Sequence, residues 1–142
     1  MANKRVKTLT VLDISPTLKM YRSTNMQLGR GKSGLKYFSK EAMAEYVRAF
    51  KDPRTIHATC EDYRASATID LMHDQKEKTK IRMPVLALWG RQGVIEALFD
   101  CLANWREVAS DVRGRSLPCG HLIPEEKPKE LLAELRRFLK GP

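Results

Sequence analysis

The stretch MPVLALWG, residues 83–90, decides the fold of this 142-residue chain. It is a nearly continuous apolar run without polar alternation, and Gly90 ends it. A run of this kind is typical of a parallel strand that is buried on both faces. Such a strand needs helices on both sides of its sheet, so this segment predicts an α/β fold.

Outward from this segment, the pattern alternates between strands and helices. Residues 6–14 form a second apolar segment rich in β-branched residues, and residues 113–117 give a short third strand. Apolar stripes at helical spacing predict helices over 39–50, 56–74, 94–109 and 129–140. Right-handed crossovers between these elements would place the three strands in one parallel sheet.

The composition fits a single globular domain, with 42% hydrophobic and 30% charged residues. No apolar run approaches the ~20 residues that cross a bilayer. The apolar stretch behind the basic N-terminus is too short for a signal peptide. We therefore expect a cytoplasmic protein with no membrane partner.

The net charge of +9 suggests nucleic-acid binding, but the distribution of charge argues against it. Basic residues are spread along the chain among acidic ones, and the densest stretches, 4–7 and 76–82, contain no aromatic residues for base stacking. The chain has three cysteines and no CxxC pair, which indicates reduced thiols without structural zinc. Spacings such as His57 with Glu61 are common on polar helix faces, so we expect neither a metal nor another cofactor.

Two polar residues lie where chemistry is expected in such a sheet. In open parallel sheets, sites form at the carboxyl ends of the strands. Asp13 closes the first strand, and His121 lies on the loop 118–128 after the last strand. A histidine on this loop, followed by an amphipathic helix, is the arrangement of α/β-hydrolases.

Several segments are similar to fluoroacetate and haloacetate dehalogenases, which are α/β-hydrolases. The similarity is nearly continuous over residues 35–139 and again over 6–26. The segments that carry it are VLDI (11–14), Pro16-Thr17, CEDYRA (60–65), LALWG (86–90), CGH (119–121) and PEE (124–126). The resemblance implies one partial domain, a truncated α/β-hydrolase fold of about three parallel strands with flanking helices. Its parts would be a core strand at 6–14, a shortened remnant of the helical cap at 15–75, and C-terminal core strands and helices at 83–142.

The resemblance also implies a reaction and three site residues. In these dehalogenases an aspartate after the fifth strand displaces halide and forms an ester, which a histidine hydrolyses by activating water. By motif, His121 matches this base and Asp13 matches the acid that orients it. Tyr63 matches a tyrosine that donates to the departing halide. The stretch 90–95 after the next strand holds no carboxylate, which supports Asp13 as the acid.

The departures from these dehalogenases concern the nucleophile and the cap. The first five strands and the nucleophile turn would precede residue 6, and no G-x-D turn occurs in the sequence. Between Met26 and Leu35 a glycine-rich stretch replaces a longer cap segment. We therefore expect a hydrolase by resemblance, acting on a small halogenated carboxylic acid, that does not dehalogenate alone. Two alternatives stay open: an interaction module pairing through an open sheet edge, as a homo-oligomer or with a complementing chain, and ester or epoxide hydrolysis in an assembly.

Overall fold

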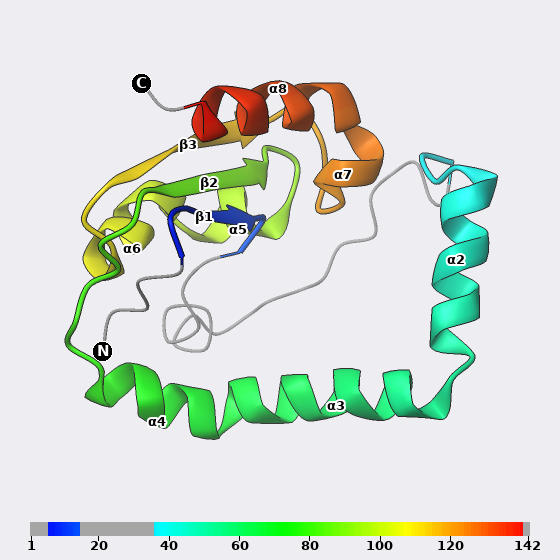
Figure 1. The fold of residues 1–142 in the computed structure, drawn as a ribbon, viewed down its shortest axis with the longest axis horizontal. Coiled ribbons are helices and arrows are strands. Elements are labelled where there is room, and N and C mark those ends of the chain that lie inside the picture. The colour runs from blue at the N-terminus through cyan, green and yellow to red at the C-terminus, as the bar shows by residue number, and fades with distance from the viewer. Residues whose placement is uncertain (1–5, 15–35, 141–142) are drawn as a thin grey trace.

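A computed structural model describes residues 6–14 and 36–140 of the chain. Three strands, β1 (Leu9–Leu12), β2 (Val85–Gly90) and β3 (Val112–Leu117), form one parallel sheet in the order β1-β2-β3 (Figure 1). The predicted parallel α/β sheet is therefore confirmed. The first strand is shorter than the predicted 6–14: its register with β2 runs from Leu9 to Leu12, and Asp13 leaves the extended conformation at a φ of +49°.

The central strand β2 is buried on both faces, as its apolar run predicts. Alternate side chains point to opposite faces of a strand, and Val85 through Leu88 are each no more than 4% exposed. Fully burying one leucine contributes roughly 1.5–3 kcal/mol to folding. One face packs in a cluster of Val85, Ala87, Ile95, Cys101, Trp105, Ala109 and Val112. The other packs in a cluster of Leu86, Leu88, Leu117, Cys119, Ile123 and Leu131.

The helices that cover these faces come from the C-terminal half. On one side lie α5 (Val94–Leu98) and α6 (Cys101–Val108), and on the other lie α7 (Ile123–Glu126) and α8 (Pro128–Leu139) (Figure 1). The single helix predicted over 94–109 is wrong, because the chain is extended at Phe99 and Asp100 caps a new helix. The predicted loop 118–128 contains the short helix α7, and α8 begins one residue earlier than expected.

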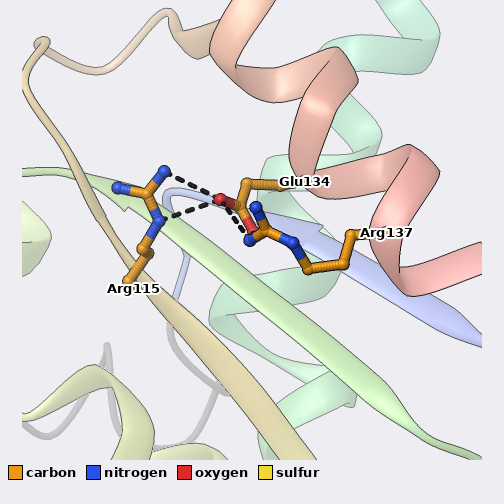
Figure 2. A network of polar contacts seen from close by, with 3 residues as sticks. All are labelled: Arg115, Glu134 and Arg137. Atoms are coloured by element: carbon orange, nitrogen blue, oxygen red, sulfur yellow. Dashed lines mark hydrogen bonds and ion pairs between the residues drawn. The ribbon is translucent and has the colours of Figure 1, made fainter. Parts of the chain in front are cut away.

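A buried carboxylate ties α8 to the edge strand β3. Glu134 is 7% exposed and accepts from Arg115 Nε at 2.9 Å and Nη2 at 2.7 Å. Arg137 donates to both oxygens of the same carboxylate, at 3.1 and 3.0 Å (Figure 2). Burying a charge is costly unless it is paired, so the two guanidinium groups allow Glu134 to lie against the sheet.

The remaining helices, α2 (Lys40–Phe50), α3 (Pro53–Ala67) and α4 (Ile69–Lys76), form the periphery (Figure 1). Ser39 caps α2 as predicted, with its hydroxyl accepting from the Ala42 amide at 3.0 Å. The predicted helix over 56–74 is instead two helices, because Thr68 leaves helical geometry at φ −131° and ψ −88°. None of the three helices has a fully buried side chain.

Parts of the sequence predictions lie outside the described residues. These include nearly all of the glycine-rich stretch and the first part of the predicted cap remnant, so the boundaries of that remnant stay a prediction. Within residues 6–14 and 36–140, no helix is both long and apolar enough to cross a membrane. A cytoplasmic location also stays a prediction.

Candidate active site

Asp13 takes an unusual backbone conformation at the end of β1. Its φ is +49°, in the left-handed region, which aspartate tolerates better than most residues. The Asp13 amide still donates to the Leu88 carbonyl at 2.6 Å, so the residue stays attached to β2. With 4% of its surface exposed, Asp13 is a buried polar group at the carboxyl edge of the sheet.

The Asp13 carboxylate joins two segments that are far apart in the sequence. Its Oδ1 accepts from the Gly90 amide at 2.8 Å, and its Oδ2 lies 2.5 Å from Nδ1 of His121. The structure therefore brings together the two residues that the sequence singled out as acid and base. Their catalytic roles stay a prediction.

The loop that carries His121 is fixed against the end of β2. A Cβ atom on Gly90 would lie 1.9 Å from the Gly120 carbonyl oxygen, so only glycine permits this approach. The Gln92 amide donates to the Cys119 carbonyl at 3.0 Å, and the Arg91 amide donates to Leu117 at 2.8 Å. These contacts set the position from which the imidazole reaches Asp13.

Contact with Asp13 determines how the imidazole of His121 can act. Because a carboxylate oxygen accepts at Nδ1, that nitrogen carries the proton, and Nε2 is the basic nitrogen of the neutral ring. The hydrogen bond that His121 donates to Asp13 is the main reason that the pKa of His121 lies above 6.5, while burial acts in the opposite direction. The side chain keeps 62% of its surface exposed, so water can reach it.

Cys119, two residues before His121, does not act as a nucleophile here. The residue is 2% exposed, and burial is the main cause that raises the pKa of its thiol to about 11, with Glu126 and Asp13 adding to the effect. At neutral pH it is a protonated thiol, whereas nucleophilic attack requires the thiolate.

Tyr63 is not brought to the Asp13–His121 pair. It lies on α3 with 68% of its surface exposed, and within the described ranges it forms no hydrogen bond to either residue. The helix α3 packs mainly against α2 and α4, at the periphery. A halide contact by Tyr63 therefore stays a prediction. The same ranges contain no group of three or more metal-ligating side chains placed to hold an ion.

Two neighbouring residues of the site were not predicted. Glu126 accepts from the amides of Gly120 and Leu122, on either side of His121. Glu125 accepts from the Tyr46 hydroxyl, which links α7 to the peripheral helix α2. Both lie in the PEE segment, but a carboxylate that accepts from backbone amides leaves no recognisable spacing in a sequence.

The parallel sheet, its covering helices and the Asp–His pair at its carboxyl edge define the class: this chain holds part of an α/β-hydrolase. It superposes with a TM-score of 0.87 and 43% identity on a protein from Nostoc sp PCC 7120 described as an alpha/beta hydrolase, covering 97% of this chain and 59% of that one. No family model matches the sequence.

Among curated proteins, the chain is similar to two hydrolases. It is 34% identical to the fluoroacetate dehalogenase of Burkholderia sp over 112 residues, which are 78% of this chain and 37% of that protein. It is 33% identical to the soluble epoxide hydrolase of Corynebacterium sp. (strain C12) over 129 residues, 86% of this chain and 44% of that protein. The chain thus spans less than half the length of these relatives.

Proposed function

We propose that this chain carries the water-activating part of an α/β-hydrolase that cleaves haloacetates through an ester on an aspartate. The observation that carries the proposal is the contact of 2.5 Å between His121 Nδ1 and Asp13 Oδ2 at the carboxyl edge of the sheet. The buried carboxylate orients the ring and stabilises its protonated form. The similarity to fluoroacetate dehalogenase supports the substrate class.

The reaction has two steps. A carboxylate attacks the carbon that bears the halogen, so a carbon–oxygen bond forms and halide leaves with the electron pair. Nε2 of His121 then takes a proton from water, whose oxygen adds to the ester carbonyl. The intermediate collapses, and the hydroxy acid leaves with a proton from His121. The regenerated carboxylic acid loses its proton to solvent.

The nucleophile of the first step must come from outside this chain. Residues 1–5, 15–35 and 141–142 contain neither aspartate nor glutamate, so the described ranges hold every acidic residue of the chain. The carboxylate that contacts His121 is Asp13, which the mechanism uses to orient the ring. Because removing a nucleophile costs several orders of magnitude in rate, we expect the chain alone not to dehalogenate.

Halide release tests this proposal directly. The purified chain, incubated with fluoroacetate or chloroacetate, should release halide no faster than buffer. The same chain, joined behind the N-terminal segment of the Burkholderia relative, should release it with turnover. In the joined protein, His121→Ala should stop after one release and accumulate the ester, seen as an increase in intact mass. If the chain alone releases halide and His121→Ala abolishes that release, the proposal that the nucleophile comes from outside this chain is overturned.

Epoxide hydrolysis is the second candidate reaction. The epoxide hydrolase relative is nearly as similar as the dehalogenase, at 33% against 34% identity. Both a haloacetate and an epoxide can pass through an ester that an activated water hydrolyses, so the Asp13–His121 pair serves either. The joined protein separates the two: diol formation from an epoxide without halide release from haloacetates would favour this candidate.

A different class of function, an interaction module, is favoured by the position of β1. This strand is an edge of the described sheet, and an edge strand presents backbone groups that can pair with another strand. The proposed partner is a second copy of this chain or a complementing chain. Size-exclusion chromatography with light scattering tests self-association, and a monomer at all concentrations would exclude the homo-oligomer.

A further inference from the structure

The glutamate that ends α7 contacts the backbone on both sides of His121. Glu126 Oε2 accepts from the Gly120 amide at 2.8 Å, and Glu126 Oε1 accepts from the Leu122 amide at 3.2 Å. One carboxylate thus holds the residue before the histidine and the residue after it. The neighbouring Glu125 points elsewhere and accepts from the Tyr46 hydroxyl.

The Glu126 carboxylate is itself held in place by the core. Ile123, at the start of α7, is completely buried in the cluster with Leu88 and Leu117. The Glu126 amide donates to the Leu122 carbonyl at 2.9 Å, which closes the helical turn. The carboxylate that accepts from the two loop amides therefore comes from a helical turn that is anchored in the core.

Gly120 completes the arrangement by allowing the close approach. A Cβ atom at this position would lie 3.0 Å from Glu126 Oε1 and 3.4 Å from Oε2, tighter than most contacts of this kind. Gly120 also lies directly over Gly90, whose amide donates to Asp13. The loop is therefore fixed between the end of β2 and the Glu126 carboxylate, with the imidazole directed at Asp13.

We propose that Glu126 is a positioning residue, which holds the His121 imidazole against Asp13 by accepting from the amides on either side of it. It acts through His121 and contacts none of the reacting atoms. A catalytic importance for this role rests on the proposed function, whereas the positioning itself concerns only the geometry of this chain. In support, the negative charge of Glu126 adds to the effects that raise the pKa of His121.

Three variants separate positioning from charge. Glu126→Gln keeps the shape but turns an NH₂ donor toward one of the two amide donors. Glu126→Asp keeps the charge but is one methylene too short to reach both amides. Glu125→Gln is the matched control, because that side chain contacts Tyr46 and neither amide.

The measurement is the titration of the His121 ring by NMR in the purified chain. We expect Glu126→Gln and Glu126→Asp to lower the midpoint by several tenths of a pH unit, and Glu125→Gln to leave it unchanged. If Glu126→Asp titrates like the original chain while Glu126→Gln does not, Glu126 acts by charge alone and the positioning role is overturned. Unchanged midpoints in both Glu126 variants would overturn it as well.

A second measurement needs no substitution, so it tests the positioning role even if the Glu126 variants fail to fold. When the original chain is acidified through the range in which carboxyl groups protonate, the amide proton shifts of Gly120 and Leu122 should move together, because their shared acceptor changes. Independent or absent movement would contradict the shared acceptor. Neither measurement needs turnover, so failure of the joined protein to release halide would count against the proposed function and not against the positioning role.

Discussion

The Asp13–His121 pair depends on one residue that leaves the strand conformation. At a φ of +49°, Asp13 turns its carboxylate back toward the end of β2, where it accepts from Gly90 and contacts His121. In a regular strand, side chains alternate between the two faces of the sheet. The left-handed turn instead places this carboxylate at the carboxyl edge, between two segments that approach each other there.

Replacing Asp13 should change how His121 titrates. The Asp13 hydrogen bond is the largest cause that raises the pKa of His121, and burial opposes it. In Asp13→Asn the opposing effect of burial remains, so we expect the His121 midpoint, followed by NMR, to fall toward or below about 6.5. The control is Asp111→Asn, which makes the same change at a half-buried aspartate beside β3. An unchanged midpoint in Asp13→Asn would mean that the contact is absent in solution.

The same shift predicts how His121 affects stability with pH. A histidine whose pKa is raised in the folded state stabilises the fold fully below its unfolded pKa of about 6.5, and this contribution is lost as pH rises through the folded pKa. The difference in unfolding free energy between the original chain and His121→Gln should therefore shrink above about pH 6.5 in urea titrations. Because 62% of the side chain is exposed, the effect should stay well under about 1 kcal/mol. If the difference in unfolding free energy between the two proteins grew with pH instead, the expected direction of the pH dependence would be wrong.

At this scale the sequence predicted the pair but not its supports. Asp13 and His121 each follow a strand, and parallel strands end at a common edge, so their approach could be expected. The amide contacts of Glu126 and the fit of Gly90 under Gly120 depend on backbone positions in three dimensions. No side-chain pattern in one sequence encodes them.

At the scale of elements, the break between α5 and α6 is the clearest departure from the sequence prediction. The apolar stripe that includes Ile95, Leu102 and Trp105 continues across the break, because both helices pack on the same face of the sheet. Periodicity alone therefore predicts one helix. Asp100 was the sequence signal for the start of a second helix, since aspartate is a preferred N-cap residue. Its side chain accepts from the Ala103 amide at 3.0 Å.

Removing the Asp100 cap should destabilise the whole fold, because α6 is a core helix. It buries Cys101 and Trp105, and the Trp105 indole donates to the Ile14 carbonyl at 2.9 Å, next to Asp13. We expect Asp100→Ala to lower the unfolding free energy by about 1 kcal/mol in chemical denaturation. Asp52→Ala removes the matching cap of α3, which has no fully buried side chain. Asp52→Ala should reduce the helical signal but change the denaturation midpoint less than Asp100→Ala does. An equal loss of unfolding free energy in the two variants would contradict the idea that α6 contributes more to the core than α3.

At the scale of the whole molecule, the described residues form a layered core with peripheral helices that bury little. Large apolar side chains are exposed on α2, α3 and α4, among them Tyr46, Phe50, Ile56 and Met72. The chain also spans less than two thirds of the solved α/β-hydrolase that it superposes on. We propose the edge of β1 and these helix faces as the surfaces on which further polypeptide would pack.

Pairing through the β1 edge can be blocked at one backbone group. The amides of Leu9 and Asp13 donate to β2, and alternate residues of a parallel strand point their N–H groups to the same neighbour, so the Thr10 amide points away from β2. Thr10→Pro removes this outward donor without removing a bond to β2, and proline on an edge strand opposes strand addition. If the chain associates through this edge, light scattering should show a lower mass for Thr10→Pro at equal concentration, while Thr10→Val, which keeps the donor, should match the original chain. If folded Thr10→Pro showed an unchanged mass, the interface would lie on the exposed helix faces and not at the β1 edge.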